Sequence, residues 1–233
     1  MASQWHFPAI IPFSEKSFLL LLLAQLLFLA IVPFLVDYPI GRIALDGALS
    51  LTLIAGTATL SHNKISLTVA VLFGVPTLAA RWLHYVLYRP ELYIASLIGA
   101  TAFFVYNAIL VIWFVMRQRH VTAGTIYGAL TGYLLLGMSW GAAFLLLEAL
   151  HPGSFNLPEA LTPASAHLVV DMISFSFITL TTVGYGEINP ATPGARGLST
   201  VEAIFGQFYM AVFVARLIGL RISQSGNEYR DQR

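Results

Sequence analysis

Hydrophobic residues occur along this chain in long runs that short polar segments separate. Six runs approach the roughly 20 apolar residues that a helix needs to cross a bilayer. They cover residues 17–36, 42–60, 65–83, 93–116, 125–150 and 198–220. The segments between the first four runs are polar, basic or proline-bearing. The pattern therefore predicts six membrane-spanning helices.

The second run is the weakest of the six, because Asp46 lies inside it. Its carboxylate can sit near the helix end and reach the headgroups, or it can be buried between helices, and the sequence leaves both open. Arg81, in the third run, can pair with Asp46. The favoured interpretation is that the Arg81 side chain instead extends to the outer membrane interface.

The connection between the fifth and sixth runs, residues 151–197, differs from the others. It begins with a polar, proline-bearing stretch, and residues 166–180 then form an apolar segment too short to cross a membrane. Threonines and glycines follow, before a second loop with Pro190 and Pro193. Irregular backbone at membrane depth is tolerated only where it is buried in protein or lines a water-filled cavity. The segment therefore predicts a short helix that enters the membrane partway and returns at a pore.

Composition supports a membrane protein and limits the other classes. Hydrophobic residues make up 58% of the 233 residues and charged residues only 10%, against about 25% charged in a soluble domain. The net charge of +1 gives no support for a nucleic-acid partner. The absence of cysteine excludes disulfides and thiol chemistry. The first run lacks the small-residue exit site of a cleaved signal.

The basic residues predict the orientation. If both termini are cytoplasmic, eight basic residues lie inside and four outside, which agrees with the positive-inside rule. The inner set is Lys16, Lys64, Arg117, Arg119, Arg216, Arg221, Arg230 and Arg233, and the outer set is Arg42, Arg81, Arg89 and Arg196.

Residues 182–186, Thr-Val-Gly-Tyr-Gly, can replace the water around a dehydrated potassium ion with backbone carbonyl oxygens. Consecutive carbonyls point the same way only if alternate residues are left-handed, and glycine reaches positive φ without a Cβ clash. Gly184 and Gly186 have this spacing. The predicted ligands are the carbonyls of Thr182, Val183, Gly184 and Tyr185, with the Thr182 hydroxyl as the innermost site.

The short helix is expected to support these ligands. The side chains of Val183 and Tyr185 should point away from the ion, and Phe175 and Phe177 are candidates to pack against Tyr185. The negative end of the helix dipole, near Leu180, favours a cation. Thr181 and Phe175 are therefore predicted to support the site.

Residues 181–186, Thr-Thr-Val-Gly-Tyr-Gly, match the signature of potassium channels, and the resemblance covers residues 124–222. It implies an outer helix, a pore helix, a selectivity filter and an inner helix, arranged as a fourfold pore. Glu187 follows the filter where the family more often has aspartate, which keeps an acidic outer mouth. Ile178 stands where some bacterial relatives carry a glutamate behind the filter.

The resemblance also implies roles along the inner helix. Gly206 aligns with a bending hinge, although a glycine that allows close helix packing explains it equally well. The residues on one face of this helix would line the cavity, or alternatively form a packing stripe: Gln207, Met210, Val214 and Ile218. Glu202 is either hydrogen-bonded against the pore helix or near the water-filled mouth.

Six spans with a pore between the last two resemble a voltage-gated channel. A sensor requires several charges in the membrane field, yet residues 93–116 contain no Arg or Lys. The first four helices are therefore expected to be a degenerate sensor-like bundle. The chain would have little voltage dependence.

The sequence thus predicts an all-α membrane protein with six transmembrane helices, a re-entrant pore helix and a tetrameric pore. Residues 1–120 would form the bundle, 121–222 the pore domain and 223–233 a short cytoplasmic tail. The partners are three further copies, membrane lipid and potassium ions, in a cell membrane that is expected to be prokaryotic, with no cofactor besides the permeant ion.

The alternatives are a poorly selective cation channel, a non-conducting accessory subunit and a membrane enzyme. An enzyme is disfavoured because the six histidines are scattered over loops and helix ends. His151 and His167 flank the expected outer mouth and are candidates for proton sensitivity.

Overall fold

The computed structural model describes residues 15–38, 40–59, 64–87, 89–157 and 165–231. Seven helices and one pair of two-residue strands make up the regular structure of these residues. In chain order the elements are α1 (Glu15–Leu35), α2 (Gly41–Thr59), α3 (Lys64–Leu87), α4 (Pro90–Arg117), α5 (Ala123–Leu150), β1 (Phe155–Asn156), α6 (Ala166–Leu180), β2 (Asn189–Pro190) and α7 (Pro193–Asp231). The predicted all-helical architecture is confirmed.

Five of the described helices are long and apolar enough to cross a membrane, namely α1, α3, α4, α5 and α7. Helix α2 has 19 residues but is not in this group, because Arg42 and Asp46 lower its hydropathy. Helix α6 has 15 residues and is too short. The predicted count of six spanning helices is therefore not confirmed, although all six predicted segments are helical.

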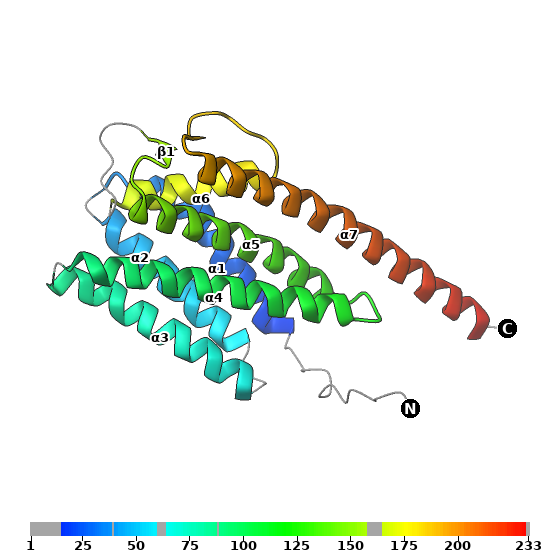
Figure 1. The fold of residues 1–233 in the computed structure, drawn as a ribbon. Coiled ribbons are helices and arrows are strands. Elements are labelled where there is room, and N and C mark those ends of the chain that lie inside the picture. The colour runs from blue at the N-terminus through cyan, green and yellow to red at the C-terminus, as the bar shows by residue number, and fades with distance from the viewer. Residues whose placement is uncertain (1–14, 39, 60–63, 88, 158–164, 232–233) are drawn as a thin grey trace, which may run out of the picture.

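The first four helices pack on one another in chain order, and α1 and α4 also pack on α5 (Figure 1). Helix α4 makes its most extensive contact with α5, and α1 packs on both α2 and α5. Helix α3 packs on α4. The outer helix of the expected pore unit is thus also the support on which the N-terminal helices are assembled.

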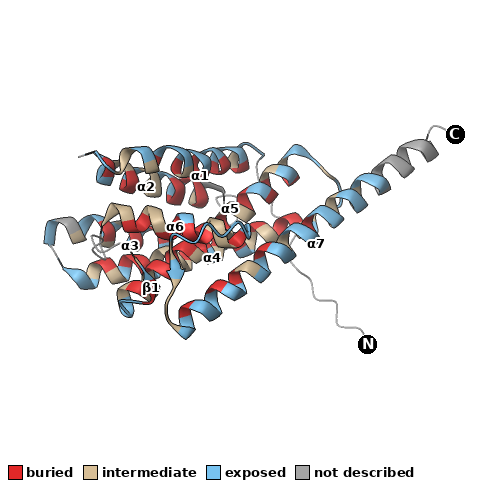
Figure 2. Ribbon diagram, turned by 90° about the horizontal axis from the view of Figure 1, so that it is seen from above, coloured by how far each residue is buried: buried red, intermediate tan, exposed pale blue. Residues whose placement is uncertain are grey.

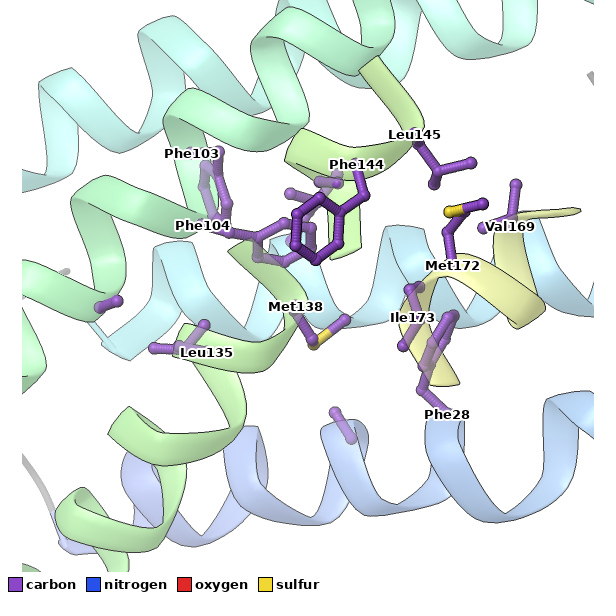
Figure 3. Close-up of a cluster of buried hydrophobic side chains, with 14 of the residues drawn as sticks. Phe28, Phe103, Phe104, Leu135, Met138, Phe144, Leu145, Val169, Met172 and Ile173 are labelled. Carbon is purple, nitrogen blue, oxygen red and sulfur yellow. The ribbon is translucent and has the colours of Figure 1, made fainter. Parts of the chain in front are cut away.

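The core lies between α1, α4, α5 and α6 (Figure 3). Met138 of α5 and Met172 of α6 are fully buried. Phe144 of α5 contacts Phe155 and Phe175 edge-on, with ring centroids 5.4 and 5.3 Å apart, a favourable arrangement for aromatic pairs. These contacts hold α6 against α5.

Helix α6 has the bounds that the sequence predicts. It begins after Ser165, whose Oγ accepts a hydrogen bond from Leu168 N at 3.1 Å and so satisfies an unpaired amide of the first turn. It ends at Thr181, whose amide donates to Phe177 O at 3.0 Å and whose hydroxyl donates to the same oxygen at 2.6 Å. Thr181 therefore closes the helix immediately before the candidate filter.

Helix α7 is the longest element and the least covered by the rest of the chain. It runs unbroken from Pro193 to Asp231, so the segment predicted as a polar tail continues the helix. Most of its residues as far as Ile222 are exposed or only partly buried (Figure 2). An apolar helix of this kind needs further partners to cover it.

Arg81 and Asp46 form a buried ion pair, with Nε 2.7 Å from Oδ1. The Arg81 guanidinium also lies 5.7 Å from the ring centre of Tyr93, within the range of a cation–π interaction. The favoured expectation that Arg81 reaches the membrane interface is therefore wrong. Burial of Asp46 between helices is the correct alternative, because each charge supplies the partner that the other requires.

Candidate functional site

The backbone after α6 alternates between right- and left-handed conformations. Positive φ angles occur at Thr182 (60°), Gly184 (60°) and Gly186 (85°). The values at Gly184 and Gly186 are those that the sequence predicts. Thr182 was not expected to adopt one, because a β-branched residue at positive φ is an outlier. Strain of this kind is held in place only by surrounding structure and tends to occur at functional sites.

The amides of this segment turn back toward the end of α6. Thr182 N donates to Thr179 O at 3.0 Å, and Val183 N donates to Ile178 O at 2.9 Å. These bonds use carbonyls that the last helical turn leaves unpaired. Among the described residues, no hydrogen bond reaches the backbone carbonyl oxygens of residues 182–185. Four successive carbonyls are therefore available to a ligand.

The side chains of this segment are open in the single chain. Val183 is 54% exposed and Tyr185 is 73% exposed. Phe175 and Tyr185 line one hollow, which Asp171 and Glu187 share. The ring contacts of Phe175 among the described residues are with Phe144 and Phe155, and its packing against Tyr185 stays a prediction.

The outer side of the segment is fastened by a network that sequence analysis did not anticipate. Asn189 Nδ2 donates to Gly186 O at 2.7 Å. Strands β1 and β2 pair antiparallel, which ties the loop after α5 to the loop after the candidate filter. At the end of α5, the Glu148 carboxylate accepts from Gly153 N at 2.8 Å and from Phe155 N at 3.1 Å.

This network positions Glu187, which is exposed next to Gly186 as an acidic outer mouth requires. The pairing of β1 with β2 joins Phe155 to Pro190, which are distant in the chain, and no local pattern in the sequence indicates it. The Asn side chain three residues after Gly186 was the one available signal, since asparagine commonly bonds nearby backbone.

The inner end of the segment meets α7. Gln207 Nε2 lies 3.4 Å from Thr182 Oγ1, so the face of α7 that carries Gln207 is next to the predicted innermost ligand. Met210, Val214 and Ile218 continue from Gln207 at helical spacing and are all exposed. The predicted cavity residues thus follow one face of α7, beginning at Gln207 next to Thr182.

Gly206 is a packing position in this structure. A Cβ at Gly206 would collide with the Leu180 carbonyl oxygen at the end of α6. Helix α7 passes through Gly206 without a break. The contact with Leu180 supports close packing, and a hinge at Gly206 stays a prediction.

Two further contacts fix α7 to the rest of the chain. Tyr209 Oη donates to Ala129 O on α5 at 2.6 Å. Lower on the helix, Arg216 Nη2 donates to Gln118 O, in the connection between α4 and α5, at 2.9 Å. The inner helix is therefore attached both to the outer helix and to the end of the N-terminal helices.

The two candidate proton-sensing histidines differ in their surroundings. His167 Nε2 lies 2.8 Å from Asp37 Oδ1, so this ring is next to a carboxylate that follows α1. His151 is exposed at the end of α5. Among the contacts of the described residues, none joins the two histidine rings at one site.

Comparisons with known proteins identify the same part of the chain. Residues 133–220 match a protein family described as "Ion channel". "Two pore potassium channel c" of Oryza sativa subsp. japonica is 32% identical over 89 residues, which are 38% of this chain and 17% of that protein. "Two-pore potassium channel 5" of Arabidopsis thaliana is 32% identical over 81 residues, 33% of this chain and 20% of that protein.

The matched segments span a fifth or less of these relatives. No solved structure gives a significant match. The family match covers the part of α5 from Tyr133 onward, then α6, the candidate filter and α7 as far as Leu220.

Proposed function

We propose that the chain is one subunit of a potassium-selective channel in which residues 182–186 of four copies form the filter. The observation that carries this proposal is the positive φ at Thr182, Gly184 and Gly186, together with four carbonyls that accept no hydrogen bond from any described residue. A potassium ion needs carbonyl oxygens in place of its hydration shell. The similarity of residues 133–220 to ion channels supports the same assignment.

Four copies are proposed because one such segment can supply only one side of an ion's coordination shell. Closed cyclic symmetry provides equivalent copies around a common axis. The exposed side chains of α7, such as Phe208, Val212 and Val214, give the neighbouring subunits an apolar surface to cover. Lipid would cover what the subunits leave exposed, in a cell membrane with both termini cytoplasmic.

Conduction is proposed to be passive and only weakly voltage-dependent. Helix α4 carries its first basic residue at Arg117, in the last turn. The Arg117 guanidinium lies 4.2 Å from the ring centre of Trp113. A basic residue held at a helix end has little field to cross. The opening would then depend on the filter or on the inner mouth at Val214 and Ile218.

The test is cation flux into liposomes that contain the purified chain. A potassium gradient should drive rapid flux, and a sodium gradient of the same size should drive little. Equal flux of the two ions would support a poorly selective cation channel instead. No flux of either ion, from protein that is folded and inserted, would support a non-conducting accessory subunit and overturn the proposal.

A further inference from the structure

Glu202 of α7 is completely buried, and no basic partner is found for it among the described residues. Its side chain faces α6, where Oε1 is hydrogen-bonded to Ser176 Oγ. The ion pair of Arg81 with Asp46 and that of His167 with Asp37 do not include Glu202. An ionised carboxylate in such surroundings is strongly disfavoured.

The hydrogen bonds at Ser176 indicate which protonation state of Glu202 fits the geometry. The Ser176 hydroxyl also lies 2.7 Å from Gly137 O of α5. A serine hydroxyl has a single proton to donate, whereas the Gly137 carbonyl can only accept. If Ser176 donates to Gly137 O, the proton between Ser176 and Glu202 must come from Glu202.

The second oxygen of Glu202 leads to the same conclusion. Oε2 is buried, and no hydrogen-bond partner is found for it among the described residues. A carboxylate would leave a share of its negative charge on this unpaired atom, whereas a neutral acid leaves only a carbonyl oxygen there. An unpaired buried acceptor is much less unfavourable than an unpaired buried charge.

We infer that Glu202 is a protonated carboxylic acid that ties the inner helix to the pore helix behind the filter. Oε1–H donates to Ser176 Oγ, and Ser176 donates to Gly137 O, so one chain of hydrogen bonds joins α7, α6 and α5. Its effect on the filter rests on the proposed function. Four residues further along α7, Gly206 touches Leu180 at the end of α6.

These two contacts are one helical turn apart and fix the direction in which α6 presents Thr182. Glu202 is therefore a positioning residue, because it reaches the proposed ion ligands only through α6.

Glu148 provides an internal contrast. It is also buried, but each of its two oxygens accepts a hydrogen bond from a backbone amide, Gly153 N at 2.8 Å and Phe155 N at 3.1 Å. Both oxygens of Glu148 therefore have donors, whereas Oε2 of Glu202 has no partner among the described residues.

Infrared difference spectroscopy at neutral pH tests this assignment. The wild-type spectrum minus that of Glu202→Gln should contain the C=O stretching band of a protonated carboxylic acid, and Ser176→Ala should shift this band. Glu148→Gln is the control for a buried glutamate that does not contact Ser176. A Glu202→Gln difference that contains only carboxylate bands would overturn the inference.

Potassium flux from the same preparations tests the positioning role. Glutamine can donate from Nε2 to Ser176 Oγ, so Glu202→Gln should keep the wild-type flux, whereas Glu202→Leu should lose most of it. Wild-type flux in folded Glu202→Leu would overturn the positioning role, as would loss of flux in folded Glu202→Gln. If the wild type itself conducts nothing, the proposed function fails while the carboxylic-acid band still tests the protonation state.

Discussion

Helices α1 to α4 differ from the segment between α6 and α7 in how their polar groups are paired. In the N-terminal region the charges of Arg81 and Asp46 are paired with each other and buried. Beyond α6, the carbonyls of residues 182–185 accept no hydrogen bond among the described residues, and the side chains of Val183 and Tyr185 are exposed. Both regions are attached to α5.

The two regions also differ in their backbone. Unpaired polar backbone is unfavourable in a membrane unless water, an ion or further protein satisfies it. In the N-terminal region most described residues lie in helices, whose backbone groups bond to one another, whereas the carbonyls of residues 182–185 have no such partners among the described residues. Changes in the first region should therefore affect stability, and changes in the second should affect conduction.

The largest effect is expected for Gly184→Ala, which should abolish potassium flux. Alanine at positive φ costs about 1–2 kcal/mol, which is too little to unfold a protein with about 5–15 kcal/mol of stability. The variant should therefore insert normally while its carbonyls turn away. Flux into liposomes, together with the yield of folded protein, measures both consequences.

Gly153→Ala is the matched control for that variant. Gly153 also has a positive φ, 87°, and a Cβ there meets nothing within 4 Å. Alanine imposes the same kind of backbone strain in the outer loop, away from the candidate filter. Unimpaired flux in Gly184→Ala, or equal loss in both variants, would contradict the assignment of Gly184.

The next largest effect is expected for Arg81→Gln, and it should be on stability. Removing one partner of a buried ion pair costs about 3–5 kcal/mol because the other charge remains buried. The thermal unfolding midpoint in detergent should fall markedly, while the ratio of potassium to sodium flux stays unchanged. Arg89→Gln, at an exposed arginine, is the control and should leave the midpoint close to that of the wild type.

A double variant tests further whether this ion pair affects stability alone. Arg81→Leu combined with Asp46→Leu removes both charges and should recover much of the lost stability. If it instead lost ion selectivity, the N-terminal helices would be part of the conduction apparatus, and the division between the two regions would not hold.

A moderate effect is expected for Gly206→Ala. Forcing a methyl group into a tightly packed contact costs about 1–3 kcal/mol, and here the methyl group meets the Leu180 carbonyl at the base of the candidate filter. Flux should fall together with the unfolding midpoint. Gly219→Ala, on the same helix with open space around the added Cβ, should leave both unchanged, and equal behaviour of the two variants would exclude a specific packing role.

The smallest effect is expected from membrane voltage. Each charge that crosses 100 mV contributes about 2.3 kcal/mol, and α4 carries no basic residue before Arg117. Open probability in planar bilayers should therefore stay nearly flat from about −100 to +100 mV. A steep activation curve would show that the N-terminal helices carry gating charge after all.

Local chemistry made part of this arrangement predictable. The short helix at 166–180 follows from an apolar run too short to span, and positive φ at Gly184 and Gly186 follows from glycine spacing. The positive φ of Thr182 was not predicted, because a β-branched side chain disfavours it. Among the described residues, contacts with α6 and with Gln207 hold Thr182 in this conformation.

Other features depend on residues distant in the sequence. The pairing of β1 with β2 joins the loop after α5 to the loop after the candidate filter, and no periodicity in the sequence indicates it. The pairing of Arg81 with Asp46 was the less favoured expectation, because hydropathy alone does not show which helices are neighbours. Gly206 was ambiguous until Leu180 was placed against it.

The most direct measurement of the central claim is an experimental map of the purified protein in a potassium solution. The account predicts four copies around one axis, with the carbonyls of residues 182–185 facing that axis and ion density between them. A map in which these carbonyls face lipid or their own subunit, with no axis shared between copies, would contradict it.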